Sequence, residues 1–251
     1  MAFLPEVRDF DLMVVEGDVP GYRYIHKFGR NPDIDTGSTP EDVWGEGGLY
    51  TGFPTGSAET VTVVSSSVLD TAAGTGARTV RLSGLNGSGA EQTEEVTLNG
   101  IINVTTINSW TRLNRVIVLT AGAGGANAGT ITVRHSVTVV NIFAVMPIGL
   151  NQTLIAAYTI PAGYTGYVRQ VSILSQQAAA SEALCGLWTR ENGSVFRNRN
   201  LFDIATGGQM IRTFTGGLAL PALTDIVIRV NSVSANNTAV SAYFDILLSL
   251  D

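Results

Sequence analysis

Between residues 57 and 134, short runs of β-branched residues alternate with glycine-rich breaks. The runs are five to eight residues long and rich in Val, Ile and Thr. The breaks contain Gly, Asn or Asp, which take the positive φ angles of tight turns at little cost. Alternation of this kind is typical of strands with one buried face. The pattern therefore predicts a first β domain over residues 57–140, without a long helix.

A second block of strand-like segments covers residues 141–251, with runs such as GYVRQVSILSQ and DIVIRVNSV. The connections between these runs are too short for helical crossovers, which favours antiparallel pairing. Strands of this number and size fit a sandwich or a jelly roll. The sequence predicts an all-β fold of two antiparallel β-sandwich or jelly-roll-like domains.

Residues 1–56 lack this regular alternation and are dense in Pro and Gly. A short strand is expected at Val7–Val15, where the run DLMVV occurs. Aromatic residues recur along the segment, whereas disordered tails are poor in them. We therefore interpret residues 1–56 as an extended, irregular N-terminal arm that docks its rings on the body or on a neighbouring molecule. Its candidate interface residues are Phe10, Tyr22, Tyr24, Phe28 and Trp44.

The formal charge is concentrated in this arm. Residues 1–50 hold ten acidic and four basic residues, which accounts for the net charge of −6 of the whole chain. Phosphate binding needs clustered Lys and Arg, so this distribution argues against nucleic acid as a partner. No run of eighteen apolar residues occurs, so no membrane span and no membrane partner are expected. The first ten residues also lack the basic and apolar regions of a signal peptide, which predicts synthesis in a cytoplasm.

The surface is expected to be poor in charge, because only 14% of the residues are charged while 45% are hydrophobic. Such a composition suits a protein whose surface is partly covered by copies of itself or by neighbours. We predict a homo-oligomer, a trimer.

Reactive residues are sparse. The chain has two histidines and one cysteine, so a zinc site would need mostly carboxylates. Cys185 lies in the apolar run ALCGLW and is expected to be a small buried thiol. We predict no catalytic, cofactor-binding or metal residues, no cofactor, and no enzymatic activity.

Two groups of residues are candidates for recognition. Arg197 and Arg199 are two apart in a strand-like run, hence on one face, where they could contact the acidic arm of another copy. Trp110, Tyr164 and Tyr167 are candidate glycan-facing aromatics that could stack on sugar rings.

A similarity to a known family is carried by three segments of the first β domain: Asp70–Val80 (DTAAGTGARTV), Glu95–Gly100 (EVTLNG) and Thr120–Gly122 (TAG). They resemble a module of virion proteins from tailed bacteriophages, notably short-tailed marine phages. Similar segments occur in the arm and in the second domain, including Lys27–Asn31 (KFGRN), Tyr158–Gly163 (YTIPAG), Gly193–Arg197 (GSVFR) and Pro221–Ile226 (PALTDI).

The resemblance implies a virion structural protein: a capsid decoration or cement, a head fibre, or a tail connector. The expected partners are copies of the chain itself and other virion proteins of the capsid, portal adaptor or tail, reached through the N-terminal arm. Two alternatives stay open at this point. One is a receptor-facing tail fibre or adhesin that binds host glycan, and the other is a cellular β-sandwich binding module.

Overall fold

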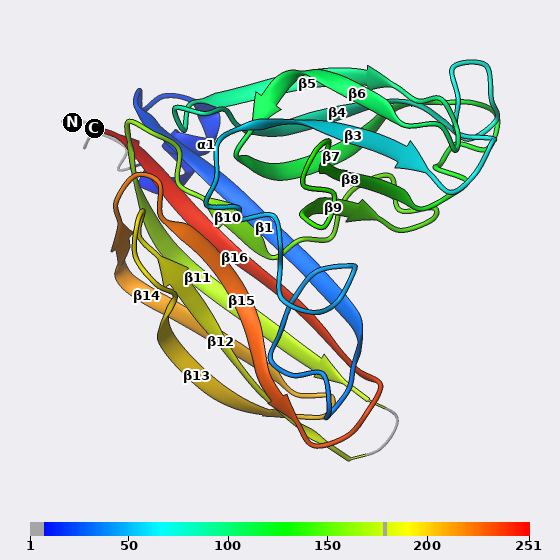
Figure 1. Cartoon of the computed structure of the whole chain (residues 1–251). Coiled ribbons are helices and arrows are strands. Elements are labelled where there is room, and N and C mark those ends of the chain that lie inside the picture. The colour runs from blue at the N-terminus through cyan, green and yellow to red at the C-terminus, as the bar shows by residue number, and fades with distance from the viewer. Residues whose placement is uncertain (1–7, 178–179) are drawn as a thin grey trace, which may run out of the picture.

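The computed structural model describes residues 8–177 and 180–251 (Figure 1). Within these residues nearly all regular structure is β, and every strand pairing is antiparallel, which confirms the all-β prediction. The elements are α1 (Phe10–Glu16), β1 (Tyr22–Ile34), β2 (Glu41–Asp42), β3 (Glu59–Ser65), β4 (Ala77–Leu85), β5 (Glu91–Thr97), β6 (Val104–Trp110), β7 (Arg112–Ala121), β8 (Ile131–His135), β9 (Ile142–Met146), β10 (Ala157–Thr159), β11 (Tyr164–Gln176), β12 (Glu182–Arg190), β13 (Arg197–Ala205), β14 (Gln209–Leu220), β15 (Asp225–Val233) and β16 (Thr238–Leu250).

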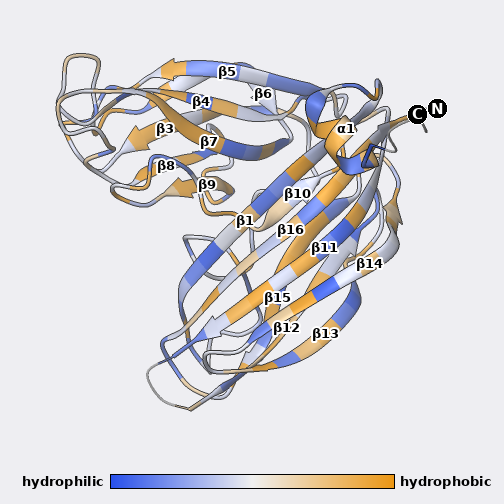
Figure 2. Cartoon of the chain, turned by 180° about the vertical axis from the view of Figure 1, so that it is seen from behind, coloured by the Kyte–Doolittle hydropathy of each residue, from blue (hydrophilic) through white to orange (hydrophobic). Residues whose placement is uncertain are grey.

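The first sandwich packs the sheet β6-β3-β8-β9 against the sheet β5-β4-β7. Inward positions recur at every second residue, as in Val61 and Val63 of β3 and Val80 and Leu82 of β4, all fully buried. Such alternation places one face of each strand in a shared core and the other in solvent. Figure 2 shows hydrophobic and hydrophilic residues alternating along these strands.

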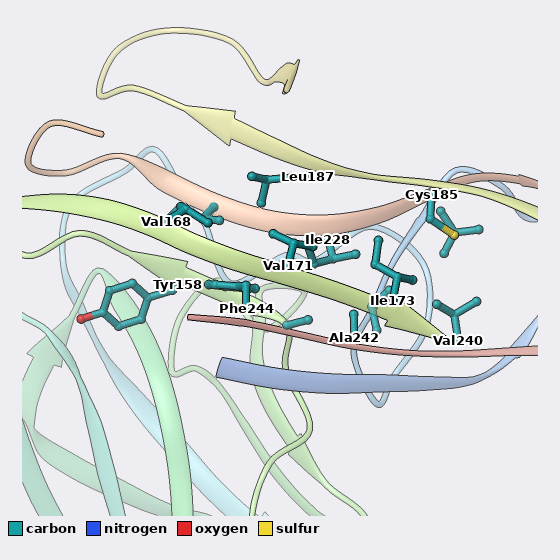
Figure 3. Packing of buried hydrophobic residues seen from close by; sticks show 14 of the residues in the cluster. Tyr158, Val168, Val171, Ile173, Cys185, Leu187, Ile228, Val240, Ala242 and Phe244 are labelled. Carbon is teal, nitrogen blue, oxygen red and sulfur yellow. The ribbon is translucent and has the colours of Figure 1, made fainter. Parts of the chain in front are cut away.

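The second sandwich packs the sheet β1-β16-β11-β14 against the sheet β10-β15-β12-β13, and the short β2 adds to β15. Its core is apolar on both inner faces. Figure 3 shows side chains of β11, β12, β15 and β16 gathered between the sheets, among them Val171, Leu187, Ile228 and Phe244. All four are fully buried, so this core is shared by strands that are distant in the sequence.

The prediction of an irregular N-terminal arm is wrong for most of its length. Residues Tyr22–Ile34 form β1, a thirteen-residue edge strand that pairs with β16, from Tyr22 opposite Ser249 to Ile34 opposite Thr238. The strand expected at Val7–Val15 is instead helix α1 over Phe10–Glu16, while residues 1–7 lie outside the described part of the chain. The segment after β1 is also embedded, because three of its aromatic side chains belong to the core of the first sandwich: Trp44, Tyr50 and Phe53.

The first sandwich is an insertion within the second. The chain builds β1 and β2, leaves to form β3–β9, and returns at β10 to complete the two larger sheets. Because β9 pairs with β8, residues Ile142–Met146 lie in the first sandwich, beyond the boundary predicted at residue 140. In Figure 1 the two sandwiches form an elbow, with the start of β1 and the end of β16 at the bend.

Candidate functional site

A buried ion-pair cluster joins the two sandwiches. Asp225, at the start of β15, has a side chain that is only 3% exposed. Arg112 of β7 donates from Nε and Nη2 to its two carboxylate oxygens, at 2.8 and 3.1 Å. Arg190, at the end of β12, donates from Nε and Nη2 at 3.0 and 2.6 Å, and the Thr159 hydroxyl donates at 2.6 Å. One carboxylate thus links a strand of the first sandwich to three strands of the second.

The same two arginines also bind the segment that connects Trp44 to β3, which we call the strap. The Arg112 guanidinium donates to the carbonyl of Pro54 at 3.0 Å, and the Arg190 guanidinium donates to the carbonyl of Phe53 at 3.1 Å. Both guanidiniums also lie near the Phe53 ring, at 5.5 and 5.7 Å from its centroid, within the range of cation–π attraction. The cluster therefore fixes the strap as well as the sheets.

A second ion pair with a buried carboxylate joins β2 to β15. Asp42 of β2 accepts from the Nε and Nη2 atoms of Arg229 on β15, at 2.6 and 3.1 Å. Burial raises the pKa of the Asp42 carboxyl, and the Arg229 guanidinium opposes that rise. The backbone N–H of Tyr50 donates to the same carboxylate at 2.8 Å, and the Tyr50 hydroxyl donates to the Phe143 carbonyl at 2.7 Å. Through Tyr50, this pair also connects the second sandwich to the first.

Lys27, the only lysine of the chain, lies on the face of β1 that meets the first sandwich. Its side chain is buried, and its ammonium donates to the backbone carbonyl of Asn114 on β7. The neighbouring Arg115 donates to the carbonyl of His26 at 2.8 Å. Burial, together with the charge of Arg115, lowers the pKa of Lys27 to about 7. The junction thus holds an amine that titrates near neutral pH.

A cleft of about 430 Å³ opens beside the ion-pair cluster. Its walls include the turns 87–89 and 192–194 and the strap residues 54–56, and its floor includes Arg112, Arg190 and Asp225. Asp225 is the one carboxylate among the described residues that line it, and both of its oxygens already accept hydrogen bonds. Acid–base hydrolysis of a glycoside needs two carboxyl groups, so this cleft lacks the required pair.

The described residues contain no group of three or more His, Cys, Asp or Glu side chains placed to hold a metal ion. Cys185 is fully buried, as predicted, and burial raises the pKa of its thiol to about 12. Over the same part of the chain, no helix is long and apolar enough to cross a membrane. The absence of cofactors and of enzymatic activity stays a prediction.

The candidate interface residues of the arm differ in how far they are exposed. Phe10 of α1 and Tyr22 of β1 are partly exposed and contact each other edge to face, with ring centroids 5.6 Å apart. Tyr24 is half-buried, and its hydroxyl donates to Asp11 of α1. Phe28 is half-buried on the same face of β1 and helps to line a shallow groove of about 340 Å³. Trp44 is only 2% exposed and packs in the core of the first sandwich, so of the two alternatives expected for the arm it docks on the body of the chain and not on a neighbouring molecule.

Arg197 and Arg199 lie on the same exposed face of β13, as the spacing predicted. Within the chain, the Arg199 guanidinium lies 3.8 Å from Glu191 and donates to the Thr189 hydroxyl at 2.7 Å. The predicted contact with the acidic arm of another copy stays a prediction.

The three candidate glycan-facing aromatics do not form a common platform. Trp110 is fully buried in the core of the first sandwich, so the prediction that it faces a glycan is wrong. Tyr164 packs against the core of the second sandwich, under the guanidinium of Arg23 at 4.9 Å. Tyr167 is three residues further along β11 and points to the opposite face of the sheet. Their positions do not support a stacking site for sugar rings.

The cluster around Asp225 was missed at the level of the sequence. Its three charged members come from strands separated by 113 and 35 residues along the chain. The available signal was that each arginine or aspartate stands at the end of a strand-like run, where a charged residue is otherwise ordinary.

Comparisons with known proteins identify no family for this chain. No protein-family model matches the chain, and no curated protein matches it. Among solved structures, it is similar to the infectious bursal disease virus Gt strain, with 11% sequence identity and a TM-score of 0.25 over 92% of this chain and 72% of that chain. It is also similar to the VP2 subviral particle of infectious bursal disease virus, with 9% identity and a TM-score of 0.23 over 92% and 72% of the two chains. At TM-scores this low, the likeness establishes neither a shared fold nor a shared function.

Proposed function

We propose that this chain is a structural subunit of a tailed-bacteriophage virion that works by self-association and by attachment to capsid or tail surfaces. Its role is that of a decoration, cement, head fibre or tail connector, without catalytic activity. The resemblance of DTAAGTGARTV, EVTLNG and the related segments to phage virion proteins supports this assignment.

The observation that carries the proposal is the way buried charge is used at the junction. Asp42 is paired through two guanidinium nitrogens of Arg229, and Asp225 is paired in the same way with both Arg112 and Arg190, with geometry that fixes one strand against another. Such pairs contribute to a defined arrangement of the sheets more than to a reactive site. A subunit that must present surfaces at a constant angle benefits from a junction of this kind.

Attachment through an extended arm needs revision, because residues 22–56 are part of the two sandwiches. What remains is helix α1, which is capped by Asp9 and ends at Gly17 with a φ of 82°. Its exposed face carries Leu12 and Val15, which are 51% and 68% exposed. We assign the attachment contact to this face of α1.

The test is to purify particles of the phage that encodes the chain and to probe them with an antibody raised against the recombinant protein. The proposal predicts labelling at regular positions on intact particles, and peptides of the chain in the mass spectrum of the purified particles. Particles free of the chain, with the chain left in the lysate, would overturn it. A control antibody against a non-virion protein of the same phage should label no particles.

A further inference from the structure

One end of the first sandwich is formed by loops that contain no exposed charged residue. It consists of four loops, residues 66–76, 98–103, 121–130 and 147–151, which we call the uncharged end. It is the end of the first sandwich that points away from the second sandwich, far from the start of β1 and the end of β16 (Figure 1). Among its 32 residues, one is charged, Asp70, and that side chain is completely buried. The loops are otherwise built from small and aliphatic residues with a few Ser, Thr and Asn.

The buried Asp70 carboxylate holds these loops together from inside. One of its oxygens accepts from the backbone N–H groups of Ala77 and Ala128, at 2.7 and 2.8 Å. The other accepts from the Ser65 hydroxyl at 2.5 Å and from the Gly129 N–H at 2.8 Å. Both oxygens of Asp70, the one charged residue of the four loops, thus accept two hydrogen bonds each from within the fold.

Asn127 extends this scaffold to the fourth loop. Its side-chain N–H₂ group donates to the backbone carbonyls of Gly129 and Pro147, at 2.7 and 2.9 Å. Its backbone carbonyl accepts from the Gly149 N–H at 3.0 Å. On the other side, the Gly100 N–H donates to the Asp70 carbonyl at 2.7 Å. The four loops therefore form one connected surface that is ordered before any partner binds, which reduces the entropy lost on association.

This ordered surface exposes large aliphatic side chains. Between 45% and 64% of each of the following residues is exposed: Val68, Leu69, Ile101, Ile102, Ile148 and Leu150. Scattered single aliphatic residues on a surface are ordinary, but Val68 and Leu69 lie on a loop in direct backbone contact with the loop of Ile101 and Ile102. These four form an exposed apolar group of the kind that marks an interaction site, and Ile148 and Leu150 follow β9 at the opposite edge of the sheet. Depletion of charge with aliphatic enrichment is the composition found at the centre of protein interfaces.

We infer that the uncharged end is the surface through which one copy of this chain contacts another. This inference rests on the proposed function, because it names the self-contact that the proposed role requires. The chain carries a net charge of −6, all of it within residues 1–50, so identical copies repel one another through that region. Contact through the uncharged end brings copies together without placing the acidic residues 1–50 in the contact. A standard interface uses about 20–30 residues on each side, and 26 of the 32 residues of the uncharged end are at least partly exposed.

A lipid surface is the competing occupant of an exposed aliphatic end. Peripheral membrane binding is usually strengthened by Lys or Arg beside the apolar residues, which attract anionic lipids. The four loops contain none, the one cation bonded to them, Arg78 of β4, donates from Nε to the Gly74 carbonyl at 3.0 Å, and the chain as a whole is acidic. These charges favour a second copy over a membrane.

The experiment is sedimentation velocity on the full chain over a range of concentrations. The test variants are Val68→Asp and Ile102→Asp, which place a carboxylate on the uncharged end. The matched control is Val195→Asp in the second sandwich, because Val195 and Val68 are 67% and 64% exposed. Circular dichroism of each variant checks that it folds.

We expect the wild type and Val195→Asp to be oligomers, and Val68→Asp and Ile102→Asp to have a dissociation constant at least about tenfold higher. Because the same surface is used by both copies, a mixture of Val68→Asp and Val68→Lys should recover association that neither variant shows alone. Recovery of this kind requires the two side chains to meet across the contact, which a merely destabilised fold would not produce.

Two results would overturn the inference in distinguishable ways. If the wild type is an oligomer and folded Val68→Asp and Ile102→Asp associate equally well, self-association uses another surface, and the proposed function is unaffected. If the wild type is a monomer throughout, the self-association in the proposed function fails together with this surface. Sedimentation of that monomer with phosphatidylcholine vesicles, lost in Val68→Asp, would then assign the uncharged end to a lipid surface.

Discussion

Replacing Lys27 with Met should stabilise the protein at neutral pH. The ammonium of Lys27 is buried at the junction with one carbonyl acceptor and with Arg115 nearby. These surroundings lower its pKa from 10.5 to about 7. At about 1.4 kcal/mol per pKa unit, the folded state is disfavoured by about 5 kcal/mol when the amine is protonated. Loss of the hydrogen bond to Asn114 offsets about 1 kcal/mol of the gain, so we expect Lys27→Met to raise the free energy of unfolding by about 4 kcal/mol.

The pH dependence of this gain has a definite sign. Below pH 7 the amine of Lys27 is protonated in the folded and unfolded states alike, so the full cost is present. Between pH 7 and 10.5 the unfolded chain binds a proton that the folded chain does not, so wild-type stability rises with pH. Above pH 10.5 the amine is neutral in both states, and the cost is gone. The difference between Lys27→Met and the wild type should therefore be largest below pH 7 and shrink toward pH 10.5.

The assay is urea unfolding of both proteins at pH 6, 7, 8, 9 and 10, followed by circular dichroism. Because Lys27 is the only lysine, one side-chain amine resonance of labelled lysine reports its pKa directly by NMR. The control is Arg197→Met, which removes an exposed cation on β13 and should give a difference that does not vary over this pH range. A constant difference for Lys27→Met from pH 6 to 10, or a measured pKa near 10.5, would refute the reasoning.

Three further outcomes are expected. Asp225→Asn should cost about 3–5 kcal/mol in urea unfolding, because it removes a buried carboxylate that pairs with two largely buried guanidiniums, whereas the exposed Asp203→Asn should change little. Gly29→Ala should lower stability by about 1–3 kcal/mol in the same assay, because a Cβ there would lie 2.2 Å from a backbone nitrogen at the junction, and Gly37→Ala, with open space around it, should not. Cys185, whose thiol has a pKa raised to about 12, should react with a disulfide reagent roughly 1,000-fold more slowly in the native than in the unfolded chain, and equal rates would contradict its burial.

The strands of the first sandwich could be predicted because their signal is local. In β3 and β4 apolar residues recur at every second position and glycine-containing turns follow, so a short window contains the whole pattern. Trp110 shows the limit of that signal. It stands at the end of β6 after Asn108 and Ser109, and the polar residues around it concealed that its side chain faces the core.

The arm was misjudged because β1 has an inverted pattern. Its aromatic residues Tyr22, Tyr24 and Phe28 lie on the outer face of the sheet, while its inner face carries Lys27 and Gly29. The inner face is polar because it meets the backbone of the first sandwich as well as the apolar core. Its pairing partner β16 also lies some two hundred residues away, and nothing in a local window reveals such a partner.

Helix α1 was mistaken for a strand because its run DLMVV is apolar and ends in two β-branched residues. The signals of a helix were nevertheless present. The Asp9 carboxylate accepts from the N–H groups of Asp11 and Leu12, and Gly17 closes the helix in a left-handed conformation. Capping residues at both ends outweigh the weak strand preference of Val14 and Val15 in so short a segment.

The insertion of the first sandwich into the second determines the order in which a nascent chain can fold. All strands of the first sandwich have been synthesised once Met146 is made, whereas β1 must wait for β16, whose register begins at Thr238. At about 5–20 residues per second, β1 spends roughly 10–40 s without that partner. Its contacts to Asn114 and Arg115 on β7 are available much earlier. The inserted sandwich can therefore hold β1 during translation and shield a long aromatic edge strand from other nascent chains.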